Sequence, residues 1–172
     1  MRVIGIDPGL TRCGVGIVDA RVGRATMVAV GVIRTSASDP TPNRLVSIES
    51  ALLEWLEEYR PEAMAIERVF AQHNLHSVMD TMQTAGVASL VGARAGLDVA
   101  YHTPSEVKAA VTGSGAADKA QLTNMVTRIL KLAQPPKPAD AADALAIAIT
   151  HAWRGPRTNR YAAAVAAAKG KR

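Results

Sequence analysis

The hydrophobic pattern of the first 61 residues predicts three strands followed by a helix. Apolar and β-branched residues, separated by turns that contain glycine, predict strands at residues 2–7, 14–20 and 26–33. Their close spacing favours an antiparallel meander. Apolar positions then recur at helical spacing after Thr41 and Pro42, where Thr41 is expected to cap the helix, and Pro61 ends it.

The rest of the chain alternates short buried strands with helices. The pattern predicts strands at residues 63–67 and 97–102. It predicts helices at residues 74–96, 118–132 and 139–153, and a further helix that begins at the capping box of Thr103 and Glu106. Loops at 113–118 and 134–138 separate the last three helices. This order predicts one α/β domain with a mixed sheet over residues 1–155.

A stripe of small residues lies along one face of the helix predicted at residues 74–96. Ala85, Ser89, Gly92 and Gly96 are spaced by four, three and four positions. Small side chains allow another backbone to approach closely. The stripe therefore predicts either packing on the protein's own sheet or a contact between two helices in a dimer.

The composition fits a single domain in a reducing compartment. The chain has 172 residues, of which 48% are hydrophobic and 20% charged, so it can form a core and carries too few charges for a disordered chain. The lone cysteine, Cys13, excludes an intramolecular disulfide and a cysteine-rich zinc site. Neither a membrane-spanning run nor the pattern of a signal peptide is evident. We expect a cytoplasmic protein without membrane contact.

The net charge of +5 is concentrated at the C-terminus. Residues 1–150 hold 14 basic and 15 acidic residues, a balance of −1, whereas residues 151–172 hold six basic residues and no acids, a balance of +6. We expect residues 156–172 to form a flexible basic tail. Such a tail is either a solvated terminus or a segment that contacts a polyanion.

Four carboxylates stand at positions that suggest a common site. Asp7 and Glu67 end two predicted strands, and Asp140 and Asp143 share one face of a helix through their i, i+3 spacing. Taken singly, Asp140 could be a helix N-cap and Asp143 an exposed acid of the first turn.

Taken together, the four acids have few basic neighbours in the sequence. Arg12 and Arg68 are the two nearby cations, so four convergent carboxylates would repel one another unless bound cations neutralised them. Oxygen ligands without histidine or cysteine suit Mg²⁺ or Mn²⁺. Two such ions ~4 Å apart can clamp the attacking and leaving oxygens of a phosphodiester displacement.

Three segments together resemble the RuvC family of Holliday junction resolvases: GIDPGLTRCGVGIVD at 5–19, AIERVF at 65–70 and ADAADALAIAITH at 139–151. The resemblance runs from residue 1 to about residue 151. It implies a ribonuclease H-like fold, a five-stranded mixed sheet with helices on both faces. It also implies a homodimer that binds four-way DNA junctions, nicks two opposing strands of like polarity and cooperates with RuvA and RuvB. Hydrolysis would depend on Mg²⁺ held by Asp7, Glu67, Asp140 and Asp143.

The resemblance further implies residues that contact DNA. Lys108 and Lys119 match family lysines near the scissile phosphate, and Phe70 matches an aromatic that stacks on bases at the crossover. The sequence alone equally allows Phe70 to be a core anchor. His73 stands where several relatives carry lysine or arginine, so a phosphate contact there would be weaker and sensitive to pH.

Three rival functions remain open from the sequence. An actin-like ATPase or sugar kinase could use the DPG sequence at residues 7–9, but it would need a second phosphate-binding domain. A non-catalytic junction-binding module of the same fold would be expected to lose its acids. A ribonuclease H-like nuclease for another branched or hybrid nucleic acid is the rival that the sequence separates least.

Overall fold

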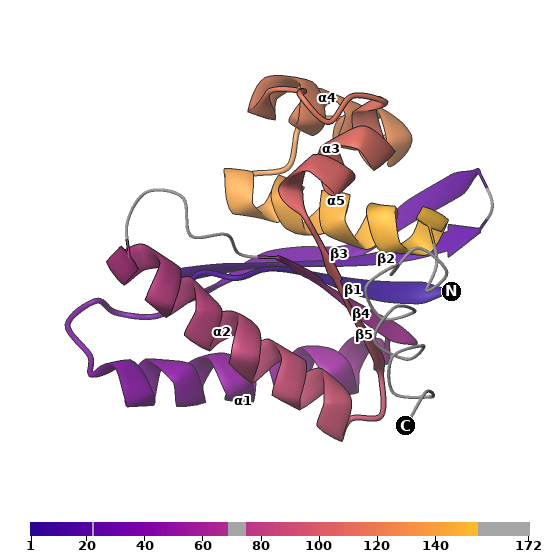
Figure 1. Ribbon diagram of the computed structural model, residues 1–172. Coiled ribbons are helices and arrows are strands. Elements are labelled where there is room, and N and C mark those ends of the chain that lie inside the picture. The colour runs from indigo at the N-terminus through magenta and orange to yellow at the C-terminus, as the bar shows by residue number, and fades with distance from the viewer. Residues whose placement is uncertain (22, 69–74, 155–172) are drawn as a thin grey trace, which may run out of the picture.

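A five-stranded mixed sheet forms the centre of the protein (Figure 1). The computed structural model describes residues 1–21, 23–68 and 75–154. The strands follow the order β3-β2-β1-β4-β5; β2 is antiparallel to both β1 and β3, whereas β4 is parallel to β1 and β5. The predicted mixed sheet and its antiparallel meander are confirmed. The strands are β1 (Arg2–Asp7), β2 (Arg12–Arg21), β3 (Arg24–Arg34), β4 (Ala63–Glu67) and β5 (Asp98–His102).

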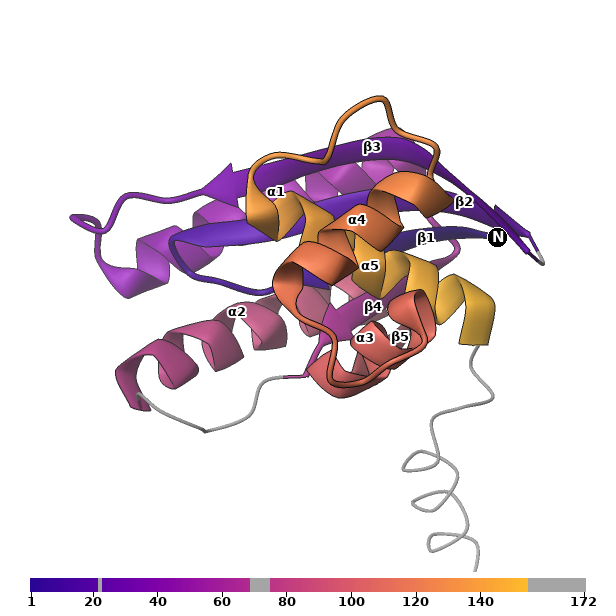
Figure 2. The same cartoon turned by 90° about the horizontal axis from the view of Figure 1, so that it is seen from above.

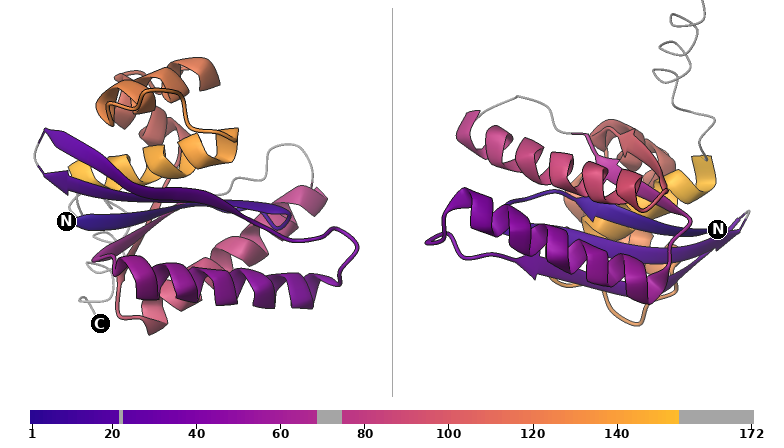
Figure 3. Two further views of the ribbon diagram at one scale, coloured as in Figure 1. Left: turned by 180° about the vertical axis from the view of Figure 1, so that it is seen from behind. Right: turned by 90° about the horizontal axis from the view of Figure 1, so that it is seen from below.

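Helices cover both faces of the sheet. Two of them, α1 and α2, lie side by side on one face (Figures 1 and 3). On the other face α5 lies directly on the sheet, with α3 and α4 packed against it (Figures 1 and 2). The helices are α1 (Thr41–Tyr59), α2 (Leu75–Arg94), α3 (Pro104–Thr112), α4 (Lys119–Ile129) and α5 (Ala139–Arg154).

Alternation along the strands divides the interior into two cores. On β1, Ile4 and Ile6 are buried toward α1 and α2, whereas Val3 belongs to the core formed with α3, α4 and α5. On β4, Met64 and Ile66 belong to the first core and Ala65 to the second. Because side chains alternate with a period of two, each strand separates its residues between the two faces.

Two predicted helix starts had different outcomes. Thr103 and Glu106 form the expected capping box of α3. At α1, however, the prediction that Thr41 is the N-cap is wrong: Pro40 holds that position, and no side chain caps the helix. Because Thr41 is already the first helical residue, its hydroxyl no longer has the cap geometry.

Several element boundaries also differ from the prediction, two of them with a clear structural reason. The second strand begins at Arg12, two residues earlier than expected, because Arg12 and Cys13 pair with Arg34 and Ile33 of β3. The helix predicted to reach residue 132 ends at Ile129, and Lys131, two residues further on, adopts a positive φ of 53°.

The small-residue stripe of α2 faces the protein's own sheet. Gly92 is buried, and a Cβ atom on it would lie 2.8 Å from both Met64 Sδ and Val99 Cγ2. Gly96 lies beyond the helix end, at a φ of 74°. At Gly92 the interpretation as a dimer contact is therefore wrong, because close packing on β4 and β5 explains why this residue is small.

Some predictions fall on residues that the structure does not describe. Phe70, His73 and the tail at residues 156–172 lie outside the described residues. Among the helices of the described part, none is long and apolar enough to cross a membrane.

Candidate active site

Strand register brings Asp7 and Glu67 together at one end of the sheet. Strands β1 and β4 are parallel neighbours, with Ile6 opposite Ile66, and the two acids are the next residues on each strand. Both isoleucines face α1 and α2, so alternation turns Asp7 and Glu67 toward α5. The two predicted strand-end acids therefore share one edge and one face of the sheet.

Three glycines allow α5 to approach that face closely. A Cβ atom on Gly14, which pairs with Asp7, would lie 2.3 Å from the carbonyl oxygen of Asp140. A Cβ on Gly5 would lie 2.2 Å from the Ala144 carbonyl oxygen, and one on Gly16 2.9 Å from the Leu145 nitrogen. Since any side chain there would displace the helix, these glycines bring the start of α5 against Asp7.

Asp140 and Asp143 each contact a cation. Arg12 Nε lies 2.7 Å from Asp140 Oδ2, and Lys119 Nζ lies 2.8 Å from Asp143 Oδ2. Asp140 is the second residue of α5, so it is not an N-cap, and the Asp143 side chain is only 17% exposed, so it is not a solvated first-turn acid. Both simple explanations for these residues are wrong, because each carboxylate is engaged by a partner distant in the sequence.

The strand-end acids are held in a strongly unfavourable environment for negative charge. Burial, reinforced by the charges of Glu67, Asp143 and Asp140, raises the pKa of Asp7 to about 8. Burial and the charge of Asp143 raise the pKa of Glu67 to about 7, against the opposing effect of Lys119 and Lys108. A bound cation would relieve this repulsion.

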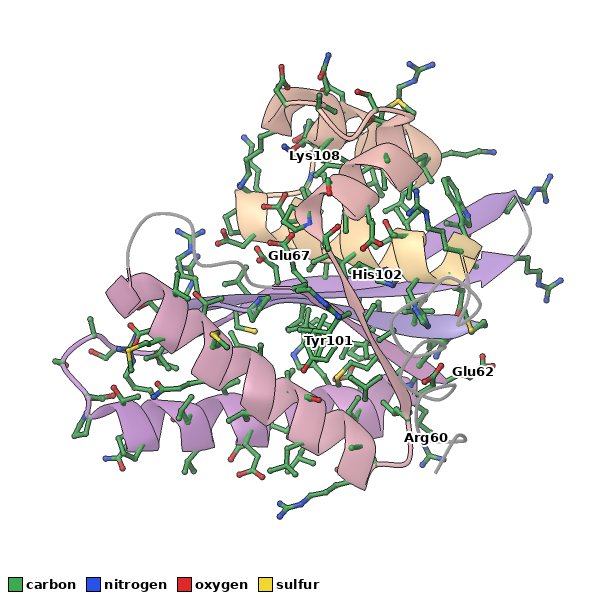
Figure 4. The ribbon with its side chains drawn as sticks, viewed as in Figure 1. Arg60, Glu62, Glu67, Tyr101, His102 and Lys108 are labelled. Carbon is green, nitrogen blue, oxygen red and sulfur yellow. The ribbon has the colours of Figure 1, made fainter. Side chains whose placement is uncertain are left out.

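Both predicted lysines lie at the same pocket. A cavity of about 200 Å³ is lined by acids from β4 and α5, by both lysines and by apolar residues of α3 and α4: Glu67, Pro104, Val107, Lys108, Lys119, Leu122 and Asp143. Figure 4 shows Lys108 on α3, on the side of the sheet toward which Glu67 points. Lys119 opens α4, whose start is fixed by a capping box between Asp118 and Gln121.

The four carboxylates fit divalent cations by their chemistry. They offer oxygen donors alone, the ligands that Mg²⁺ and Mn²⁺ prefer, and the raised pKa values of Asp7 and Glu67 record uncompensated negative charge. In the described part of the chain, however, no three His, Cys, Asp or Glu side chains form a group that could hold one ion. Asp140 and Asp143 are turned to Arg12 and Lys119, so metal binding requires these two side chains to change partners.

The histidines of β5 and α5 form a buried pair. His102 Nε2 lies 3.2 Å from His151 Nδ1, and both rings are buried. Burial lowers the pKa of His102 to about 4 and also lowers that of His151. Both rings are therefore neutral at pH 7.

Sequence reasoning missed the roles of Arg12 and of the three glycines. The sequence indicates only that Arg12 is a cation near the acids, whereas in the structure its side chain contacts Asp140. The glycines carried a usable signal: Gly5 is two residues before Asp7, and Gly14 and Gly16 are two apart on the next strand. That spacing places small residues on the face of the sheet to which the acids belong.

The sheet has the strand order and directions of the ribonuclease H-like class, and helices cover both of its faces. It carries acids at the ends of β1 and β4, with two more on α5, and this arrangement defines that class. Residues 3–151 match the family model described as crossover junction endodeoxyribonuclease RuvC. The chain belongs to the RuvC family.

Relatives along nearly the full length support this assignment. The crossover junction endodeoxyribonuclease RuvC of Streptomyces avermitilis is 62% identical, over 99% of both chains. That of a Nocardioides species is also 62% identical, over 98% of this chain and 96% of the relative. Among solved structures, Thermus thermophilus RuvC in complex with a Holliday junction substrate superposes with a TM-score of 0.86 at 36% identity, covering 91% of this chain and 96% of that one.

Proposed function

We propose that this protein is a Holliday junction resolvase. In this proposal it binds four-way DNA junctions and nicks two opposing strands of like polarity, symmetrically, in recombination and repair. The observation that carries the proposal is the convergence of Asp7, Glu67, Asp140 and Asp143, from three separate parts of the chain, at one end of the sheet in a member of the RuvC family.

The four carboxylates are the proposed ligands of the catalytic ions. Two Mg²⁺ ions, for which Mn²⁺ can substitute, would polarise the scissile phosphate and activate a water molecule for in-line attack. Asp7 and Glu67 are fixed by strands, whereas Asp140 and Asp143 are presented by the first turn of α5. Rigid elements suit this task, because ligands must be held within a fraction of an ångström of the productive geometry.

The two lysines are the proposed contacts for the DNA backbone at the cleavage point. Lys108 and Lys119 line the same cavity as Glu67 and Asp143, and their charges lower the pKa of Glu67. Each would donate hydrogen bonds to phosphate oxygens. Phe70 and His73 remain proposed DNA contacts from the sequence, Phe70 by stacking on bases at the crossover.

We also propose that the protein acts as a homodimer, because paired nicks require two sites related by symmetry. The helix α2 carries an exposed face in which Met79 and Met82 are each 59% exposed and Leu90 is 48% exposed. Gly86 lies on this face, and within the described residues no atom from outside its own helix lies within 4 Å of its Cβ position, so a second helix could approach closely. This face replaces the buried stripe of Gly92 as the proposed contact.

The cellular setting of the proposed activity is the cytoplasm, with RuvA and RuvB as the proteins that move the junction. The free thiol of Cys13 is consistent with a reducing compartment. Co-sedimentation of the protein with a junction already bound by RuvA and RuvB would test the proposed partnership.

A panel of DNA substrates tests the proposed activity. A mobile four-way junction, a flap, a linear duplex and an RNA–DNA hybrid are each incubated with the protein and Mg²⁺, and the products are mapped on a denaturing gel. We expect paired nicks in the junction and little cleavage of the other three. Preferential cleavage of the flap or the hybrid would instead support the rival ribonuclease H-like nuclease.

A further inference from the structure

Two arginines lie next to each other beside the candidate active site. Arg12 of β2 pairs with Arg34 of β3 at the end of the hairpin nearest Asp7. Both residues are exposed. Gly14 and Gly16 of β2 face α5, and Val30 of β3 packs against the core on that side, so alternation points both arginines to the same face as the acids.

This pairing is unfavourable in the protein alone. Residues directly opposite in an antiparallel pair have Cβ atoms about 4.5–5.5 Å apart, and like charges there are destabilising. Within the described residues Arg12 makes one ion pair, with Asp140, and the Arg34 side chain makes no ion pair or hydrogen bond. The two guanidinium groups therefore have room for an anion from outside the protein.

A buried arginine links the side chains of the two threonines that adjoin this pair. Arg44 is 7% exposed and donates to the hydroxyl oxygens of Thr11, at 2.6 Å, and Thr35, at 2.8 Å. Thr11 precedes Arg12, and Thr35 follows Arg34 in the chain. The Thr35 amide also donates to the Thr11 carbonyl oxygen at 3.2 Å. Both arginines thus stand on a preorganised part of the sheet.

We propose that Arg12 and Arg34 bind a backbone phosphate of the DNA beside the catalytic centre, and that Asp140 restrains Arg12 until a divalent ion takes over this carboxylate. The proposal rests on the proposed function, since it requires both a metal site and a DNA substrate. The 2.7 Å contact between Arg12 and Asp140 must open when Asp140 becomes a metal ligand.

The exchange couples metal binding to DNA binding. When the ion neutralises Asp140, Arg12 is released and joins Arg34 as a second positive charge for the phosphate. Coupling between two ligands is reciprocal, so DNA should strengthen metal binding by the same factor. The arrangement gives this chain a way to hold the substrate most tightly when its site is loaded.

The test measures junction affinity as a function of salt concentration, once with Ca²⁺ and once with a chelator. The variants are Arg12→Gln and Arg34→Gln, with Arg24→Gln as the matched control. Arg24 belongs to the other arginine pair of the same hairpin, opposite Arg21 at its far end. The Arg24→Gln substitution therefore removes the same charge at a position far from the four carboxylates. A denaturing gel verifies that the junction remains uncut.

The two arginines should respond differently to the metal. Each phosphate that is neutralised contributes about −0.9 to the slope of log affinity against log salt, and the two arginines share one phosphate, so Arg34→Gln should flatten the slope by up to about that amount in both conditions. Arg12→Gln should flatten it by a similar amount with Ca²⁺ and by less than about 0.3 with the chelator. Arg24→Gln should leave both slopes unchanged.

A second readout follows the metal without DNA. Calorimetric titration with Ca²⁺ should show about 1.5- to 5-fold tighter binding to Arg12→Gln than to the wild type, the range that loss of a partly exposed ion pair corresponds to. Arg24→Gln should bind Ca²⁺ as the wild type does.

Several results would overturn the proposal. If Arg12→Gln matched Arg24→Gln with Ca²⁺, Arg12 would not contact the phosphate. If Arg12→Gln flattened the salt slope equally with and without Ca²⁺, Asp140 would not restrain Arg12. If Arg34→Gln left the slope unchanged, Arg34 would not contact the phosphate. A wild-type protein that bound no Ca²⁺ and did not prefer the junction to a duplex would overturn the proposed function as well.

Discussion

The buried carboxylate of Asp7, a proposed metal ligand, destabilises the folded protein when no metal is bound. Its pKa, about 8, is the higher of the two values at the strand ends, because burial and three neighbouring acids all oppose its charge. In the unfolded chain the same group ionises near its ordinary value of 3.8. The folded state therefore binds more protons than the unfolded state between these two values, and its stability falls as the pH rises through this range.

Replacing this charge should stabilise the metal-free protein. We expect Asp7→Asn, in a chelator, to raise the free energy of unfolding at pH 8 by on the order of a few kcal/mol, with a gain that shrinks toward pH 4. Mg²⁺ should stabilise the wild type more than the variant. Thermal unfolding measured across this pH range, with and without Mg²⁺, provides the check.

Asp19 offers a matched control on the neighbouring strand. It forms an ion pair with Arg2 at 2.8 Å, and hydrogen bonding to Arg2 lowers its pKa. Its stabilising contribution is therefore complete above its ordinary pKa, so Asp19→Asn should cost at most about 1 kcal/mol, evenly between pH 5 and 8. A metal-free Asp7→Asn protein less stable than the wild type at pH 8 would contradict the assigned charge repulsion.

Close packing between α5 and the sheet sets the geometry of the candidate site. A strand glycine opposite each contact point allows the helix backbone to touch the sheet, and small α5 side chains complete the interface: Ala141, Ala144 and Ala148 are at most 1% exposed. The distance from α5 to β1 and β2 thus determines how close Asp140 and Asp143 lie to Asp7.

A methyl group at Gly14 should therefore disturb the site more than the fold. Its Cβ would lie 2.3 Å from the Asp140 carbonyl oxygen, so Gly14→Ala must shift the start of α5. Overpacking of this kind costs about 1–3 kcal/mol. We expect the loss of junction cleavage per folded molecule to exceed what unfolding explains, as measured by turnover beside chemical denaturation.

Gly31 provides the comparison on the opposite face. There an added Cβ meets the ring of Trp55 at 3.0 Å, a side chain that can yield, rather than a backbone atom. Gly31→Ala should cost less than about 1 kcal/mol and leave turnover unchanged. If both variants lost turnover equally, the close approach of α5 would not be what positions the acids.

The strands and helices were largely predictable, because period and turn residues determine them locally. All five strands and the capping box at Thr103 follow from such signals. The side-chain partners of the four acids could not be predicted from such local signals. Arg12 reaches Asp140 across 128 positions and Lys119 reaches Asp143 from another helix, contacts that depend on tertiary packing. The sequence alone likewise does not show which face of α2 packs on the sheet and which is exposed.

Paired nicking requires the assembled protein to present two sites. The exposed α2 face is well suited to a dimer contact, because three large apolar side chains stand in solvent around Gly86. Exposed apolar surface of this kind marks interaction sites. Gly92, in contrast, is enclosed by Met64 and Val99, so Gly92→Leu should unfold the protein rather than separate subunits.

A charge on the α2 face should separate the proposed dimer. We expect Met82→Glu to sediment as a folded monomer that nicks single strands without pairing the two cuts, because the charge would be buried in the contact. Leu53→Glu is the matched control, since Leu53 is 49% exposed on the neighbouring helix α1 and should leave the dimer intact. A Met82→Glu protein that stays dimeric would exclude this face.

The most direct test of the four-carboxylate site is a comparison of junction binding and junction cleavage by Asp143→Asn. This change removes the charge of a proposed metal ligand and keeps its size. In Mg²⁺ we expect cleavage to fall more than about 100-fold, beyond the usual effect of changing a residue that supports a ligand, while junction affinity persists or increases. Cleavage near the wild-type rate by the folded variant would contradict the account.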